Sequence, residues 1–135
     1  MSYDVYLRGP KCAHCGVTPQ EPECPDPTYN LTPVFDLALT GEPLPNAEVS
    51  EGHVVILGAR TDRPRGLRIL SGRTAAETLP DLERAVLRLN DTAMTHEFCK
   101  LEPANRWGTL DDAQFVMQKL LDQARSYPTF TWEVH

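Results

Sequence analysis

The stretch TLDDAQFVMQKLLDQARSYPTFTWEVH, residues 109–135, holds both of the element types from which the fold is predicted. Its first part predicts a helix over 110–125, because Thr109 suits an N-cap and Asp111 and Asp112 suit the positive end of a helix. Apolar residues at helical spacing then form one stripe, made of Leu110, Ala113, Val116, Met117, Leu120, Leu121 and Ala124. We therefore expect a long amphipathic helix that packs one face against a core.

The last residues of this stretch change to the alternation of a strand. Phe130, Trp132 and Val134 are apolar and separated by polar residues, which is typical of an edge strand. YDVYLR, residues 3–8, shows the same alternation near the other end of the chain. We expect these terminal strands to pair in a small, mainly antiparallel sheet covered by about three or four helices, which is an α+β fold.

The segments between the terminal strands are expected to form a helix over 33–40, a pair of strands over 53–57 and 67–72, a helix over 74–90 and a weaker helix over 92–101. Thr32 followed by Pro33 is typical of a helix start, and Gly41 of a helix end. Thr74 and Glu77 have the spacing of a capping box, and Pro80 is expected to restart that helix.

Length, charge and hydropathy restrict the class of protein. A chain of 135 residues is expected to form a single domain over 1–135, with an irregular loop rich in proline and cysteine at 9–30. The net charge of −6 argues against general affinity for nucleic acid or an anionic membrane. No apolar run approaches the roughly 20 residues that span a bilayer, and MSYDVYLRGP lacks the apolar core of a signal peptide. A cytosolic location is expected, so the cysteines are predicted to be thiols or metal ligands.

KCAHCGV, residues 11–17, places Cys12 and Cys15 on one turn, where a tetrahedral Zn²⁺ can bind both thiolates. Cys24 is the third ligand of the structural zinc site predicted here, and the candidates for the fourth are Cys99, His14 and His96. A redox pair and ordinary thiols are the alternatives, although a thioredoxin-like pair would open a helix rather than lie in a proline-rich loop. A zinc deaminase is excluded, because the order and spacing of its motifs do not occur.

Two further motifs, PTYNLTPVFDLAL at 27–39 and EPANRWGTLDDA at 102–113, carry a resemblance that spans nearly the whole chain. With the opening SYD and its strand, they resemble a group of small, mostly bacteriophage-borne proteins that have T-Y-N, T-H-N or T-W-N before the first helix. Those proteins have P-x-N-G-W-G before the last long helix, and the Cys-x-x-Cys resembles the variant in phages of actinobacteria. The resemblance implies a non-structural accessory phage protein and no particular activity.

The residues that match these two motifs are Thr28, Tyr29, Asn30, Pro103, Asn105, Trp107 and Gly108. Arg106 stands where the group usually has glycine, which puts a close backbone approach there in doubt. Asn30 and Asn105 each precede a helix start, where asparagine can cap the helix or form an Asx-turn. The alternative is that both amides line one pocket with Tyr29 and Trp107. Such a pocket would suit a planar or phosphate-bearing ligand, because aromatic faces stack and helix N-termini bind anions.

RTDRPRGLRILSGR, residues 60–73, concentrates arginine on an otherwise acidic chain. Its RPRG turn is expected to project Arg63 and Arg65 into solvent. One interpretation is a solvated turn balanced by Asp62 and other acids. The other is an anion-binding site for a nucleotide, a phosphate or an acidic partner surface, because guanidinium groups suit those anions.

The sequence contains no Ser/His/Asp set, Walker loop, GxGxxG or HExxH motif. We interpret it as a non-enzymatic phage accessory protein in the cytoplasm of the infected host, which binds a host protein or a small, anionic, nucleotide-like ligand and has a role in counter-defence. One alternative is a small nucleotide-acting enzyme that uses Asn30, Asn105 and an arginine. The other is a zinc-stapled interaction scaffold. A homo-oligomer is left open.

Overall fold

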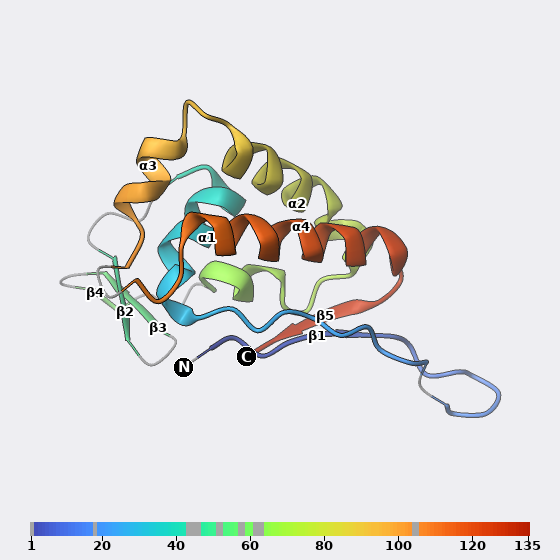
Figure 1. Ribbon diagram of the computed structural model, residues 1–135. Coiled ribbons are helices and arrows are strands. Elements are labelled where there is room, and N and C mark those ends of the chain that lie inside the picture. Colours follow the sequence, from blue (N-terminus) through green and yellow to red (C-terminus); the bar gives the residue numbers. More distant parts are fainter. Residues whose placement is uncertain are drawn as a thin grey trace.

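The computed structural model describes residues 2–17, 19–42, 47–50, 53–56, 59–60, 64–103 and 106–135, with the backbone alone for those between 47 and 60. Helices α1 (Thr32–Thr40), α2 (Ala75–Asn90) and α4 (Leu110–Ser126) pack over a two-stranded antiparallel ribbon of β1 (Val5–Arg8) and β5 (Thr131–Val134) (Figure 1). The predicted α+β class is therefore confirmed, and so is the pairing of the terminal strands.

The β1–β5 ribbon buries one face and exposes the other, as its alternating sequence predicts. Leu7 pairs with Trp132 and Val5 with Val134, and all four side chains are buried. The Trp132 indole N–H donates a hydrogen bond of 2.9 Å to Thr78 Oγ1 on α2, so this large side chain is buried with its polar atom satisfied. The ribbon is thereby fastened to the helical layer.

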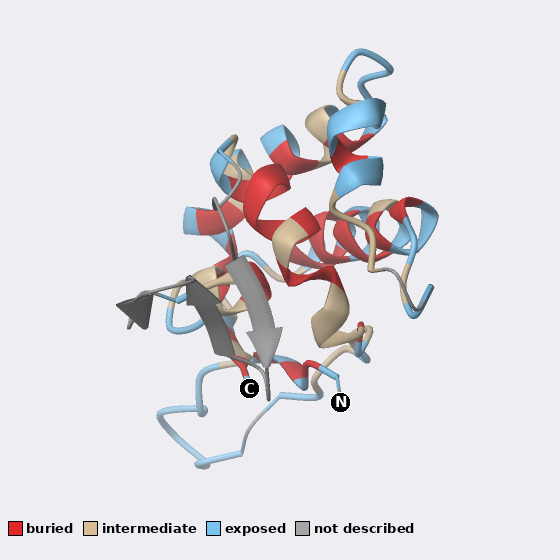
Figure 2. Cartoon of the chain, turned by 90° about the vertical axis from the view of Figure 1, so that its left-hand side faces the viewer, coloured by how far each residue is buried: buried red, intermediate tan, exposed pale blue. Residues whose placement is uncertain are grey.

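Helices α2 and α4 pack against each other, and each has a buried side and an exposed side, drawn red and pale blue in Figure 2. The stripe predicted on α4 is buried, and the predicted N-cap forms a complete capping box in which Thr109 and Asp112 exchange hydrogen bonds. On α2 the Thr74 hydroxyl accepts the Glu77 N–H at 3.3 Å. Pro80 does not restart this helix but lies exposed within it, near the N-terminal end, where the cost is one backbone hydrogen bond.

The strand predicted over 67–72 is wrong, because the chain there forms the 3₁₀ helix η2 (Gly66–Leu70). Leu67 and Leu70 are both fully buried, and residues three apart share a face in a 3₁₀ helix. The strand predicted over 53–57 is β3 (His53–Ile56), and Leu57 lies outside the described residues. Its partners are β2 (Ala47–Ser50) and β4 (Ala59–Arg60), in a separate antiparallel sheet.

The remaining elements are short. A 3₁₀ turn, η1 (Tyr29–Leu31), leads directly into α1, so Thr28 rather than Thr32 accepts the capping bond, from Asn30 N–H. Helix α1 ends at Gly41, which has the left-handed conformation expected of a C-cap, with φ of 80°. Helix α3 (Thr95–Lys100) is shorter than the predicted segment. In the described part of the chain, the helices lack the length and apolar character needed to span a membrane.

Candidate functional site

The two motifs that carry the family resemblance meet at Gly108. Its φ is +112°, and a Cβ added there would lie 2.8 Å from both Leu31 Cγ and Thr28 Cγ2. A side chain at this position would therefore collide with the segment that leads into η1. The backbone before α4 can approach residues 28–31 this closely only because the residue is glycine.

A groove of about 540 Å³, open to solvent, lies along this contact. It is lined by Ser2, Pro25, Asp26, Pro27, Thr28, Leu31, Trp107, Gly108, Asp112, Phe115 and Val116. Two aromatic side chains on its surface are mostly exposed, Trp107 by 68% and Phe115 by 67%. Two exposed aromatic side chains beside one groove are candidate contact residues.

Helix α4 supplies one wall of the groove. Phe115 and Val116 lie three and four residues after Asp112, so both neighbour Asp112 one turn further along the helix. Val116 points into the core and Phe115 stays at the surface. The capping box at Thr109 fixes where the helix begins and hence the position of this face. The opposite wall is the extended, proline-containing segment 25–28.

Carboxylates satisfy the backbone at the start of α4. The Leu110 N–H donates to Glu102 Oε1 at 2.8 Å, and the Thr109 N–H donates to Asp112 Oδ2 at 2.9 Å. Asp26 adds a further acidic side chain to the groove. These amides have internal anionic partners, and the groove carries negative charge, so this end of the helix suits a cationic group better than a phosphate.

The structure separates the residues of the T-Y-N motif. Thr28 lines the groove, whereas Tyr29 packs edge-on against Tyr3, with ring centroids 4.7 Å apart, and Arg68 lies over its ring. The groove is lined by Thr28 and Leu31 on this side, not by Tyr29 or Asn30. The predicted neighbour Asn105 lies outside the described residues. Of the residues predicted to line a shared pocket, the structure places Trp107 in the groove.

Arg106 has φ of +60°, the left-handed conformation that favours glycine. The sequence resemblance led us to expect glycine at this position, and the backbone has the conformation that glycine would adopt. The arginine side chain is exposed and is not among the residues that line the groove.

A buried carboxylate, Asp36, lies beneath the arginine-rich segment. Its Oδ1 accepts the Gly66 N–H at 2.8 Å. Burial raises the pKa of Asp36 to about 6, against the opposing effects of the Gly66 N–H and the Arg65 charge. Among the described residues, Asp36 Oδ2 and Arg65 Nε are buried without a hydrogen-bond partner.

The arginines predicted to bind an anion are only partly described. Arg65 is half-buried beside Asp36 rather than projecting into solvent, and Arg63 lies outside the described residues. Arg68 donates to Tyr29 Oη at 3.3 Å, and Arg73 forms an ion pair of 2.9 Å with Asp81. Anion binding by Arg63 and Arg65 stays a prediction.

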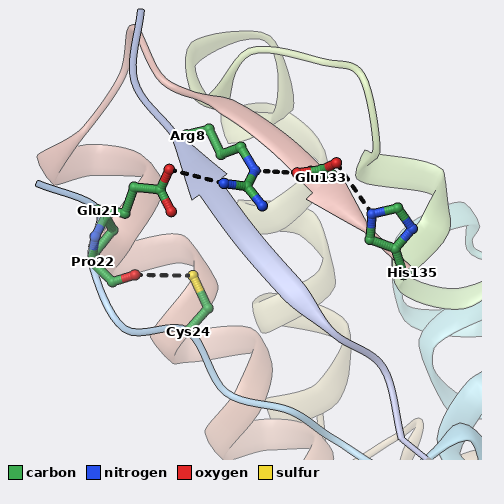
Figure 3. A network of polar contacts seen from close by, with 6 residues as sticks. All are labelled: Arg8, Glu21, Pro22, Cys24, Glu133 and His135. Carbon is green, nitrogen blue, oxygen red and sulfur yellow. Dashed lines mark hydrogen bonds and ion pairs between the residues drawn. The ribbon is translucent and has the colours of Figure 1, made fainter. Parts of the chain in front are cut away.

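The three cysteines predicted to bind zinc have different surroundings. Cys12 and Cys15 are exposed, and Cys24 is half-buried against the core with its thiol 3.8 Å from the Pro22 carbonyl (Figure 3). Burial raises the pKa of the Cys24 thiol to about 11. In the described part of the chain, no three His, Cys, Asp or Glu side chains are arranged to hold a metal ion. Zinc binding stays a prediction.

Sequence reasoning missed Phe115 and the segment 25–27. A signal for Phe115 was present, because this aromatic residue lies off the apolar stripe of its own helix. An apolar side chain on the polar face of an amphipathic helix is a candidate contact residue. Comparisons with protein-family models, with curated proteins and with solved structures found no significant match.

Proposed function

We propose that this protein is a non-enzymatic binding protein whose groove accommodates a segment of a partner protein. The observation that supports this proposal is that two largely exposed aromatic side chains, Trp107 and Phe115, both line one open groove. Aromatic side chains at the centre of an interface supply much of its binding energy. Each leaves about two thirds of its surface in solvent, so a partner could bury a large apolar area there.

Charge complementarity favours an apolar segment with a basic residue. Asp26 and Asp112 line the groove. Asp111 precedes Asp112 in the sequence, and Glu102 accepts a hydrogen bond from the Leu110 N–H at the start of α4. The chain as a whole has a net charge of −6. A lysine or arginine of the partner would meet these carboxylates, while its apolar neighbours would cover the two aromatic rings. A nucleotide phosphate would meet like charge, so the groove supports the protein partner over the small anionic ligand.

The resemblance to phage accessory proteins supports a host protein as that partner. On this proposal the protein acts in the cytoplasm of an infected bacterium, and blocking a defence protein is the role that fits a binder without catalytic motifs. Binding in the groove would then prevent the host protein from binding its normal partner.

The proposal is tested by comparing groove and control variants of the full chain. The host protein captured from lysate by the wild type is identified, and its contact segment is mapped with a photo-cross-linking residue at position 115 and, separately, at position 87. The synthetic segment is then titrated against the wild type, against the Trp107→Ala/Phe115→Ala variant and against Leu87→Ala. Leu87 is a matched control because it is 70% exposed on α2, outside the groove.

The expected result is cross-linking from position 115 but not from 87, to an apolar and basic segment. Loss of the two aromatics should weaken its affinity at least about 30-fold, the effect of a hot-spot residue, whereas Leu87→Ala should not. Raising the salt concentration should weaken binding further. Equal affinity for all three proteins would contradict the proposal. A nucleotide retained in native mass spectra and lost with Trp107 would favour the small ligand instead.

A further inference from the structure

The loop of residues 9–17 is a second candidate site, separate from the groove. Every residue from 10 to 17 is exposed, and the loop extends away from the helices (Figure 1). It carries Cys12 and Cys15, which are both free thiols. We propose that two copies of the chain bind one Zn²⁺ between them, with Cys12 and Cys15 of each copy as its four ligands.

The turn already has the shape that two zinc ligands need. The Gly16 N–H donates to the Cys12 carbonyl at 2.9 Å, the Cys12 N–H donates to the Val17 carbonyl at 2.9 Å, and Gly16 has φ of +69°. Both thiols are exposed on this turn and can therefore reach a metal ion from the solvent side.

The spacing of the two cysteines also suits a shared ion. Cys12 and Cys15 lie three residues apart on one hydrogen-bonded turn. Tetrahedral zinc with bonds of about 2.3 Å holds its sulfur ligands about 3.8 Å apart, so neighbouring thiolates on one turn match half of its coordination shell.

Among the described residues, the same chain offers no further side chains that complete the shell. Cys24 is the nearest cysteine in sequence, but its thiol faces the Pro22 carbonyl and its pKa is raised by burial. The described residues offer no group of three metal-binding side chains, and this range includes Cys12, His14, Cys15, Cys24 and Cys99. A structural zinc requires four ligands, so two must come from another molecule.

A second copy of this chain suits the site for electrostatic reasons. Each chain has a net charge of −6, yet residues 9–17 contain Lys11 and no aspartate or glutamate. Two copies therefore repel each other least at this loop. Zinc with four thiolates carries a charge of about −2, which Lys11 of each copy would offset.

The loop also has an exposed apolar side chain, and contacts at its two ends hold it against the β1–β5 ribbon. Val17 is 62% exposed, and contact with the second loop would cover it. Arg8 bonds both Glu21 and Glu133 and so ties the returning chain to the β1–β5 ribbon, as Figure 3 shows. Gly9 permits close contact with Pro19 and Phe130, where a Cβ would collide. The turn is thus held out from the body in a position that a second copy can reach.

The test measures zinc content and mass on the same full-length protein. Wild type purified under reducing conditions should contain 0.5 equivalents of zinc per chain and have the mass of a dimer in light scattering. Removal of zinc by a chelator should give a monomer with an almost unchanged melting temperature, because the loop is outside the core. Adding Zn²⁺ alone should restore the dimer, and Co²⁺ in its place should give the absorption spectrum of a four-sulfur site.

Variants separate this arrangement from a site within one chain. Cys12→Ser/Cys15→Ser should bind no zinc and stay monomeric, whereas Cys24→Ser and the matched surface control Cys99→Ser should keep both zinc and dimer. One zinc per monomer, loss of zinc in Cys24→Ser, or a dimer that survives complete zinc removal would each overturn the proposal. A Cys12–Cys15 disulfide in place of zinc in freshly reduced wild type would also overturn it.

Discussion

The two tryptophans of this protein occupy opposite environments. Trp132 on β5 is 1% exposed, and its indole N–H is bonded to Thr78. Trp107, just before α4, is 68% exposed at the groove. Folding energy explains the first, since it buries a large apolar area and satisfies its polar atom. The second buries only about a third of its surface, so less of its area contributes to folding and more is open to a partner.

The largest effect is expected from Trp132→Ala. Removing a buried tryptophan leaves a cavity between the ribbon and α2, and the free energy of unfolding should fall by about 3–5 kcal/mol. Trp107→Ala should change it by less than about 0.5 kcal/mol, as expected for an exposed side chain. Urea denaturation of both variants measures the difference. Similar losses of unfolding free energy would mean that Trp107 also stabilises the fold, and the two tryptophans would then not differ in role.

Gly108→Ala tests whether the contact beneath the groove belongs to the core. The new Cβ would lie 2.8 Å from Leu31 and Thr28 at φ of +112°, so a loss of about 1–3 kcal/mol in unfolding free energy is expected. Gly72→Ala is the matched control, because its φ is +82° but no atom lies within 4 Å of its added Cβ. If thermal denaturation shows equal losses, backbone strain alone explains the effect and the close contact contributes nothing.

Asp36→Asn tests how the buried carboxylate of Asp36, unlike the carboxylates of the groove, affects the pH dependence of stability. Burial raises the pKa of Asp36 from 3.8 to about 6, so the folded state binds this proton more tightly than the unfolded state. The stability from Asp36 is therefore greatest at low pH and is lost as pH rises through about 6. Between pH 5 and 7.5 the wild type should lose about 1 kcal/mol more than Asp36→Asn. Urea denaturation at both pH values checks this, and an identical pH dependence in the two proteins would refute it.

Arg106→Gly should have the smallest effect, and it should be stabilising. Glycine adopts φ of +60° without the steric cost that arginine has there, although it loses more entropy on folding. A gain of about 0.5–1 kcal/mol, or a few degrees in Tm, is expected. Arg106→Ala should bring no such gain, because alanine has the same Cβ. A lower Tm for the glycine variant would show that the arginine side chain supports the groove.

Local signals predicted most of the fold. The Thr109–Asp112 capping box, the left-handed Gly41 and the alternation around Trp132 each require only neighbouring residues, and each is present in the structure. Residues 67–72 were misassigned because their apolar run fits a strand and a 3₁₀ helix equally well. The choice depends on Leu67 and Leu70 facing the same core, which is a tertiary contact.

The candidate site was less predictable for a related reason. Trp107 and Gly108 could be singled out from their motif, but the collision that a side chain at Gly108 would cause with Leu31 depends on the packing of segments far apart in sequence. The only sequence signal for Phe115 as a site residue was its position outside the apolar stripe of α4. Tyr29 shares a motif with Thr28, yet it packs against Tyr3 while Thr28 lines the groove, and spacing in a 3₁₀ turn does not distinguish the two.

The pairing of β1 with β5 also constrains when the protein can fold during its synthesis. Val5 pairs with Val134, so the first strand leaves the ribosome long before its partner is made. Helices α1 and α2 can form earlier, but Val5 and Leu7 have no strand partner until residues 131–134 emerge. In that interval the first strand presents an unpaired edge to other nascent chains. The ribbon can therefore be completed only after the residues of β5 have emerged, and Trp132 arrives with them.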